Sequence, residues 1–374
     1  MSADQTPPSK GATKSLEAWR LVRSMLDDMT RVIEEDAETE LELLDGLRVL
    51  ARVTALCSEL SVDVDHERPY FFAMNTPLRY VGGPNPDGAY HLAMIDGARR
   101  YRIRGRRGTV AYLGFQVLAG RGLTPRRMAA HVSDRDLAIL PSGDFELVLA
   151  QRRPPPHELQ AATWIEIPED ASGIVVRQYV ADATREEPAT YSIEPLDRPA
   201  PSSLPTDEEV ALQLTAMAWT IVKLTTLHRT IRPELLTTPN QFLTTAAAGL
   251  GSENTAPDNL YMIGTFRLGP DEALVIDARP PETRYWNLTI ENVWHECFDA
   301  RARQISVTSA AATPRPDGRV RIVVAARDPG IPGTSWLDTG GRHRGFVTFR
   351  WLDNPQPPQV TTSVVPLDEV AHLP

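Results

Sequence analysis

The densest group of residues that could do chemistry in this chain is the stretch WHECFD, residues 294–299. It places His295, Glu296 and Cys297 side by side, and a histidine next to a cysteine is one way to activate a thiol nucleophile. Catalytic partners usually stand apart in the sequence, and in an extended strand Glu296 would face away from the other two. We therefore weigh His295 and Glu296 as catalytic candidates against a strand end that carries a buried cysteine and solvated charges.

A second group lies in NPDGAYHLAMIDG, residues 85–97, directly before the arginine-rich RRYRIRGRRG, residues 99–108. Its mixture of aromatic and polar groups is what small-molecule pockets use, whereas Asn-Pro-Asp-Gly on its own is an ordinary turn sequence. The catalytic candidates here are His91 and Asp96, and the ligand-binding candidates are Tyr90, His91, Arg102 and Arg104.

Six of the ten residues from 99 to 108 are arginine, but the pattern is that of a strand. Tyr101 and Ile103 alternate with arginines, as in a strand buried on one face. We favour a solvated or salt-bridged face, because the chain has 49 acidic residues that could pair with these arginines. The alternative is an anion or carboxylate site bound by guanidinium groups. Nucleic acid ranks last, because no aromatic residues interleave with the basic ones as in single-strand binding platforms.

Several chemistries lack their sequence motifs. The chain has no P-loop, no G-x-S-x-G nucleophile elbow and no G-x-G-x-x-G loop after a strand. None of its eight histidines stands in a metal-binding spacing, so we expect no metal site and no cofactor.

The composition limits which binding partners and which cellular compartment we expect. The formal net charge of −10 disfavours nucleic acid and anionic membranes. Two distant cysteines fit a reducing compartment, and no apolar run approaches the roughly 20 residues of a membrane span. We expect a cytoplasmic protein without membrane insertion.

The elements that must position these residues begin with helices. Apolar residues recur at three- and four-residue intervals over 15–34 and again over about 38–60, which predicts a helical pair. Trp19, Leu44 and Leu47 fall on the expected buried stripes. Thr206 and Glu209 form a capping-box pair that opens another helix.

From Pro69 to about 196, and again from about 260, short apolar runs alternate with turn signals, which predicts strands. The two β-rich halves read as copies, because five segments match in the same order at offsets of 172–176 residues. The matching segments are 88–93 with 264–269, 101–105 with 274–278, 111–117 with 284–290, 145–154 with 320–329, and 163–182 with 335–354. In this alignment Trp164 matches Trp336, and we expect each indole to close the open end of a sandwich.

The predicted fold is mainly β with α: two jelly-roll-like β-sandwich domains from an internal duplication, an N-terminal helical pair and a helical connector. The expected segments are a disordered lead-in at 1–14, the helical segment at 15–65, the first sandwich at 66–196, the linker and connector helices at 197–256, and the second sandwich at 257–374.

Together, the segments 84–117 and 282–300, the turn PDGRVRIVVAARDPGIPGTSWLD and the strand FVTFRW resemble the bacterial family called domain of unknown function 1214. The resemblance covers about 70 to 365, and actinobacterial members often carry an N-terminal helical segment like the one here. It implies β-sandwich domains of jelly-roll type and no agreed activity or catalytic residue. Some members are similar to proteins found beside lipid- or steroid-modifying enzymes.

Three functions stay open at this point. The first is a protein that binds a small, partly apolar or anionic ligand, in lipid- or steroid-related metabolism if the family hint holds. The second is a hydrolase or lyase with a site in the first sandwich. The third is a structural protein that self-associates into a homo-oligomer through its N-terminal helices. The sequence names neither the ligand nor the reaction.

Overall fold

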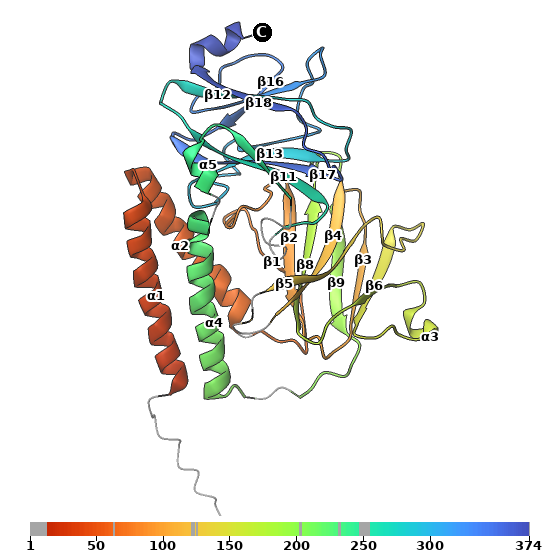
Figure 1. Cartoon of the computed structure of the whole chain (residues 1–374). Helices are drawn as coiled ribbons and strands as arrows, with labels where there is room; N and C mark the ends of the chain where they lie inside the picture. Colours follow the sequence, from red (N-terminus) through yellow and green to blue (C-terminus); the bar gives the residue numbers. More distant parts are fainter. Residues whose placement is uncertain are drawn as a thin grey trace, which may run out of the picture.

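The computed structural model describes residues 13–62, 64–120, 124, 126–201, 204–230, 233–246 and 255–373. The expected lead-in at 1–14 lies almost wholly outside these residues. Strand exceeds helix, and the fold class predicted from the sequence is confirmed (Figure 1). In the described part of the chain, no helix has both the length and the apolar character that crossing a bilayer requires.

The first β-rich half is a sandwich of two sheets, called the first sandwich below. Its five-stranded sheet has the order β1-β2-β8-β4-β5 and its four-stranded sheet the order β7-β6-β3-β9. The strands are β1 Phe72–Ala73, β2 Gly88–Met94, β3 Tyr101–Arg106, β4 Tyr112–Ala119, β5 Arg127–Ser133, β6 Asp144–Ala150, β7 Thr163–Glu166, β8 Ala171–Tyr179 and β9 Thr190–Pro195. A short helix, α3 (Pro156–Leu159), precedes β7. The core between the sheets includes Ile103, Phe115 and Leu147.

The second half, called the second sandwich, repeats this topology strand for strand. Its sheets have the orders β10-β11-β17-β13-β14 and β16-β15-β12-β18, so each strand corresponds to the one nine places earlier. The strands are β10 Phe242–Ala246, β11 Asn259–Arg267, β12 Glu272–Ala278, β13 Trp286–Glu291, β14 Ser306–Thr308, β15 Val320–Ala325, β16 Thr334–Asp338, β17 Arg344–Leu352 and β18 Val360–Pro366. A C-terminal 3-10 helix, η3 (Leu367–His372), packs on β12 and β18.

The strand ladders correct part of the sequence alignment of the two copies. Gly114 and Asn287 match at the predicted offset, and they lie opposite Arg177 and Arg350. The offset between β8 and β17 is therefore 173, not 172, and Arg177 corresponds to Arg350. By the same ladders Gly88 corresponds to Asn259, not to Gly264.

Trp164 and Trp336 do occupy equivalent positions, because each indole Nε1 donates to the carbonyl of an equivalent alanine, Ala150 at 3.2 Å and Ala325 at 3.0 Å. The expectation that they close the sandwiches is wrong. Neighbouring strand residues face opposite ways, so Ile165 enters the core and Trp164 lies on the outer side.

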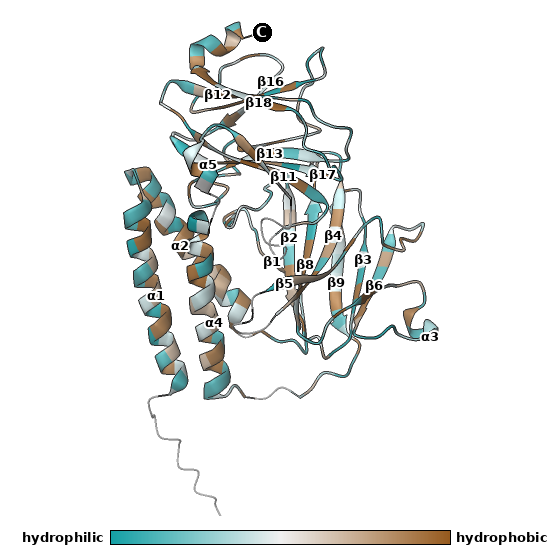
Figure 2. Cartoon of the chain, viewed as in Figure 1, coloured by the Kyte–Doolittle hydropathy of each residue, from teal (hydrophilic) through white to brown (hydrophobic). Residues whose placement is uncertain are grey.

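The helices form a bundle beside the sandwiches. It contains α1 (Lys14–Asp36), α2 (Glu40–Ser61) and α4 (Asp207–Thr225), and the short η1 (Leu227–Thr230) and α5 (Pro233–Thr237) follow α4. Thr206 caps α4 in the predicted capping box. Hydrophobic residues of the helices face one another and the sheets (Figure 2). On α2, Leu56 and Leu60 cover Leu92 and Val175 on the outer face of the first five-stranded sheet.

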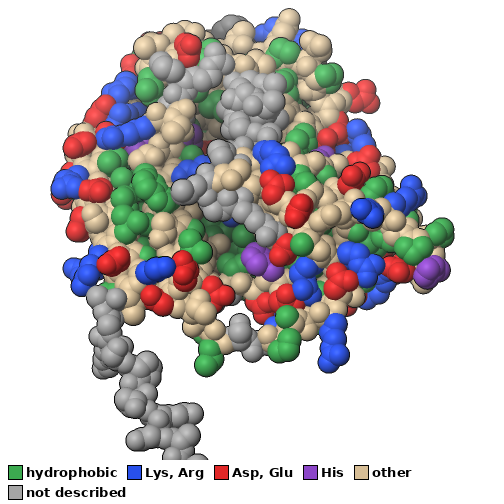
Figure 3. Space-filling model, turned by 60° about the horizontal axis from the view of Figure 1, so that its bottom comes forward, with side chains coloured by type: hydrophobic (Ala, Val, Ile, Leu, Met, Phe, Trp, Pro, Cys, Tyr) green, Lys and Arg blue, Asp and Glu red, His purple; other side chains and the backbone are tan. Residues whose placement is uncertain are grey.

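Three apolar residues predicted to be buried are exposed: Trp19 at 47%, Leu44 at 51% and Leu47 at 41%. The buried face of α2 is instead centred on Gly46, where a Cβ would lie 2.5 Å from Ile33 and 2.9 Å from Trp294. This close approach rotates Leu44 and Leu47 toward solvent. On the face seen in Figure 3, hydrophobic side chains gather on the helical side, and positive and negative charges are mixed over the rest.

The helix α2 joins the second sandwich through ion pairs as well as through its apolar contact with Trp294. Arg342, on the turn before β17, binds Asp45 in two hydrogen bonds of 2.6 and 3.0 Å, with both side chains at most 4% exposed. Arg344 binds Glu42 in the same manner, at 2.8 and 2.6 Å. These pairs fix the helical bundle to the second copy.

The sandwiches themselves are joined by the Asn-Pro-Asp-Gly turn. Asn85 is fully buried, and its Nδ2 donates to the Tyr285 hydroxyl at 2.7 Å. Asp87 accepts from Asn287 Nδ2 at 3.0 Å and from Ser306 Oγ at 2.8 Å. A turn at the start of β2 thus binds the second sandwich.

We predict that Asp45→Ala lowers the free energy of unfolding by about 3–5 kcal/mol, because it leaves the Arg342 guanidinium buried without its carboxylate. Urea unfolding followed by circular dichroism measures this. Arg31→Ala is the control, since its pair with Asp28 is 67% exposed on the arginine side and is expected to contribute less than about 1 kcal/mol. A loss below about 1 kcal/mol for Asp45→Ala would contradict the anchoring role of this pair.

Candidate functional site

The structure separates Tyr90 from His91. They are neighbours on β2, so their side chains leave the sheet on opposite faces. His91 points into the first sandwich, where its Nδ1 lies 2.6 Å from the Tyr191 hydroxyl. Tyr90 lies on the outer face of the five-stranded sheet, with the guanidinium carbon of Arg177 5.6 Å from its ring centre. The two residues therefore do not line one common mouth.

Asp96 serves the turn that precedes β3. Its amide donates to the Tyr101 hydroxyl at 2.9 Å, and its carboxylate accepts from the Ala98 amide at 2.9 Å. These contacts position the turn, and none of them brings Asp96 to His91.

Arg102 and Arg104 lie on the outer face of the first four-stranded sheet. Arg104 Nε donates to Glu146 at 2.9 Å, and Arg102 Nη2 donates to the Glu158 carbonyl oxygen at 2.7 Å. The positions equivalent to Arg104 and Glu146 are Asp277 and Arg321, which also pair, at 2.8 Å, with the charges exchanged. Both copies thus keep a cross-strand ion pair here, which agrees with a salt-bridged face for most of the arginine run.

His295 and Glu296 lie at the other side of the molecule, beside the helices. His295 stacks on Phe346 with ring centres 3.8 Å apart, and its Nδ1 lies 3.0 Å from Glu291 Oε2. Glu296 is buried and binds Arg52 of α2. Cys297 bonds to the Pro84 carbonyl oxygen at 3.3 Å, and burial raises the pKa of its thiol well above the usual range. This arrangement does not activate a thiolate.

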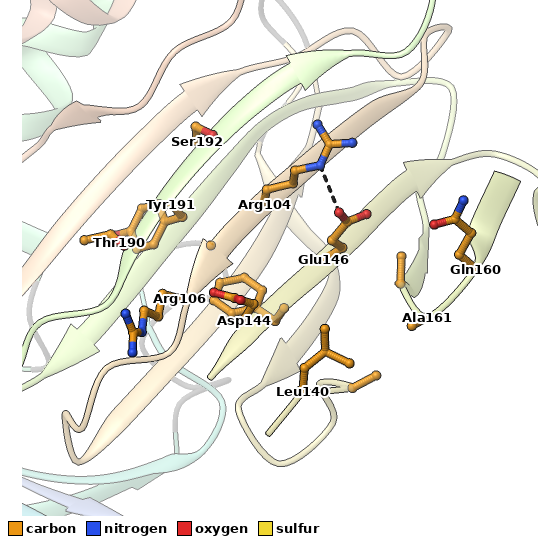
Figure 4. Close-up of a pocket in the computed structure, with 14 residues that line it drawn as sticks. Arg104, Arg106, Leu140, Asp144, Glu146, Gln160, Ala161, Thr190, Tyr191 and Ser192 are labelled. Carbon is orange, nitrogen blue, oxygen red and sulfur yellow. Dashed lines mark hydrogen bonds and ion pairs between the residues drawn. The ribbon is translucent and has the colours of Figure 1, made fainter. Parts of the chain in front are cut away.

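A hollow with a volume of about 700 Å³ lies on the outer face of the first four-stranded sheet (Figure 4). We call it the sheet groove. Strands β3, β6 and β9 form its floor, and the segments around Leu140 and Ala161 form its rims. Of the predicted site residues only Arg104 lines it, together with Arg106, Asp144 and Glu146, which were not singled out from the sequence. No group of three metal-ligating side chains occurs among the residues with described positions.

Arg106 differs from the other arginines of this run. Its side chain makes no ion pair or hydrogen bond with any residue in the described part of the chain. Asp144 lies opposite it in the ladder, but the Asp144 carboxylate accepts from Ser142 Oγ at 2.7 Å instead. The guanidinium of Arg106 is therefore available to a ligand in the sheet groove.

Gln160, on the rim of the groove, has a rare backbone conformation for a residue other than glycine, with φ 49° and ψ −118°. Such a conformation costs of order 1–3 kcal/mol and is often found where function requires it. Nothing in the local sequence, HELQAA, indicates this strain.

The family model described as "Protein of unknown function (DUF1214)" matches residues 270–357. An uncharacterised protein from Burkholderia cenocepacia is 30% identical, with a TM-score of 0.88 over 96% of this chain and 99% of that one. The chain belongs to the DUF1214 family.

A second solved structure, that of a protein from Vibrio parahaemolyticus, has a similar fold to this chain and is 11% identical to it in sequence. Its TM-score is 0.51, over 85% of this chain and 98% of that one. A search of curated proteins finds no match. The predicted family is thus confirmed, and none of these relatives carries an activity in its description.

We predict that His91 makes this protein less stable as the pH falls. Burial lowers the pKa of His91, so the unfolded chain takes up a proton more readily than the folded one below the usual histidine pKa. The free energy of unfolding should decrease as the pH drops from 7 through that range, and His91→Gln should remove part of the decrease. Urea unfolding at pH 7 and pH 5 measures it; an equal decrease in both proteins would contradict the assignment.

Proposed function

We propose that this protein binds a small, partly apolar ligand carrying an acidic group, and that the sheet groove holds it. The observation that carries the proposal is the free Arg106 guanidinium in a hollow of about 700 Å³. Ligand pockets commonly have volumes of about 300–1,000 Å³ and combine apolar walls with a few placed polar groups.

The groove has apolar rims for the apolar part of such a ligand and an arginine for its acidic group. Leu140 is 49% exposed on one rim, and Ala161 and Ala162 form the other, so an apolar chain has surface to cover. Arg106 can bind a carboxylate through two parallel hydrogen bonds. Arg104 is less available, because Glu146 and Glu194 already hold it.

The charges around the groove are only partly shared by the two copies. Arg104 and Glu146 correspond to Asp277 and Arg321, whose charges are exchanged, whereas the position equivalent to Arg106 is Arg279. The same proposal places the protein in lipid- or steroid-related metabolism, as the family resemblance suggests, and in the cytoplasm, as the composition suggests.

We predict that octanoate raises the melting temperature of the protein in a saturable manner, whereas octanol, which has the apolar chain but no acidic group, does so weakly. Arg106→Gln should weaken octanoate binding by about 10- to 100-fold, since a hydrogen-bonded charge pair contributes about 1.5–3 kcal/mol. Ala161→Trp should also weaken it by filling the groove.

Thermal-shift titration measures these affinities. The matched control is Arg185→Gln, an arginine of the first half whose side chain is 85% exposed and which does not line the groove. Equal octanoate affinity in wild type and Arg106→Gln would refute the groove assignment, and no stabilisation by octanoate would refute the ligand class.

A further inference from the structure

Strands β8 and β17 are buried along almost their whole length, yet each carries an arginine in its interior. Arg177 is 6% exposed and Arg350 is 3% exposed. The ladders make them equivalent: Arg177 lies opposite Tyr90 and Gly114, and Arg350 lies opposite Tyr261 and Asn287. Both copies thus place a guanidinium on the outer face of the five-stranded sheet.

The two outer faces meet in one polar region, which we call the seam. Tyr112, Tyr179 and Tyr285 stack across it, with ring centres 4.9 and 5.2 Å apart. The guanidinium carbon of Arg177 lies 5.6 Å from the centre of the Tyr90 ring. Burial raises the pKa of Tyr90, and the charges of Arg350 and Arg177 oppose that rise. The arginines of the two sandwiches therefore act on the same phenol.

Arg350 has partners inside the protein. Its Nη2 donates to the Gly83 carbonyl oxygen at 2.7 Å and lies 3.9 Å from Glu291 Oε1. Its Nη1 lies 3.4 Å from Thr289 Oγ1. A carboxylate of the chain thus accompanies the charge of Arg350.

Among the described residues, no carboxylate accompanies the charge of Arg177. Its Nη1 donates to the amide oxygen of Gln116, and among the described residues it forms no ion pair. Asp258 accepts from the Tyr112 hydroxyl at 2.9 Å, and Asp87 is held by Asn287 and Ser306. Burial raises the pKa of Asp87, which makes it a poor counter-charge. A buried charge without a partner costs several kcal/mol, so buried charges are normally paired.

Further groups of the seam lack partners. The Tyr90 hydroxyl accepts from the Asn85 amide at 3.1 Å, and its own proton has no acceptor in the described part of the chain. The Oδ1 atoms of Asn259 and Asn287 are buried without a hydrogen-bond partner. Tyr90 and Asp87 are partly exposed. The seam is therefore polar, contains groups without partners among the described residues, and is open to solvent at these two side chains.

We propose that the seam is a buried anion-binding site, in which a small organic carboxylate balances the charge of Arg177. The guanidinium of Arg177 and the hydroxyl proton of Tyr90 supply donors for the carboxylate oxygens, and the two asparagine oxygens accept from water or from a hydroxyl of the ligand. This site lies on the opposite sheet of the first sandwich from the sheet groove and does not depend on it.

The test is a thermal-shift titration of the full chain, dialysed free of anions, with sodium acetate, benzoate, phosphate and chloride at constant ionic strength. We expect saturable stabilisation by acetate or benzoate and only the ionic-strength baseline with chloride. Arg177→Gln should raise the apparent Kd at least tenfold, and Arg327→Gln, an exposed arginine of the second sandwich, should leave it unchanged.

The stability of the ligand-free variants separates a binding role from a structural one. Removing an unbalanced buried charge should leave Arg177→Gln at least as stable as wild type without a carboxylate. A loss of melting temperature in Arg177→Gln, together with no carboxylate response in wild type, would overturn the proposal. If Arg177→Gln does not fold, Tyr90→Phe replaces it: weaker carboxylate binding supports the site and unchanged binding refutes it. Stabilisation by phosphate alone would refute the carboxylate class.

Discussion

The structure depends on the burial of both faces of its two five-stranded sheets. One face of each sheet fills a sandwich core, and the other is covered by α2 or by the seam. Polar groups on the covered faces must therefore find partners inside the protein. This constraint explains the Asn85–Tyr285 and Asp87–Ser306 contacts across the sandwiches and the Arg350–Glu291 contact within the second. It also isolates Arg177, which has an amide oxygen as its partner and no carboxylate among the described residues.

The same constraint explains how the helices are held. Three-residue and four-residue spacing predicted α1 and α2 to within two residues at each end, because local apolar patterns determine where a helix forms. The faces that these helices bury depend on distant partners, which local patterns do not contain. Gly46 admits Trp294 from a turn some 250 residues away, and Asp45 meets Arg342, so Leu44 and Leu47 turn outward.

The internal duplication could be predicted from the sequence. The predicted alignment of the two copies, however, did not match Arg177 with Arg350, which is the most informative pair. The sequence alignment of β8 with β17 was wrong by one residue. It matched Arg177 with Phe349, so it did not show that both buried strands carry an arginine. Side chains alternate along a strand, so a one-residue error exchanges the core face for the outer face. Arg104 and Arg106 lie in the same conspicuous arginine run, but only the ladder shows that Arg106 has no partner among the described residues. The strained Gln160 had no signal in the sequence and is found only on the rim of the groove. Shared positions in the two copies are thus not all scaffold.

The most direct measurement of the central claim, that Arg177 carries a buried charge left for a carboxylate ligand, is an anomalous difference map from a crystal of the full chain grown with sodium para-bromobenzoate. We expect a bromine peak in the seam, with the carboxylate of the ligand within hydrogen-bond reach of the Arg177 guanidinium and close to Tyr90. A well-ordered seam in which Arg177 pairs with a carboxylate of the chain, such as Asp258, and no bromobenzoate is bound would contradict it.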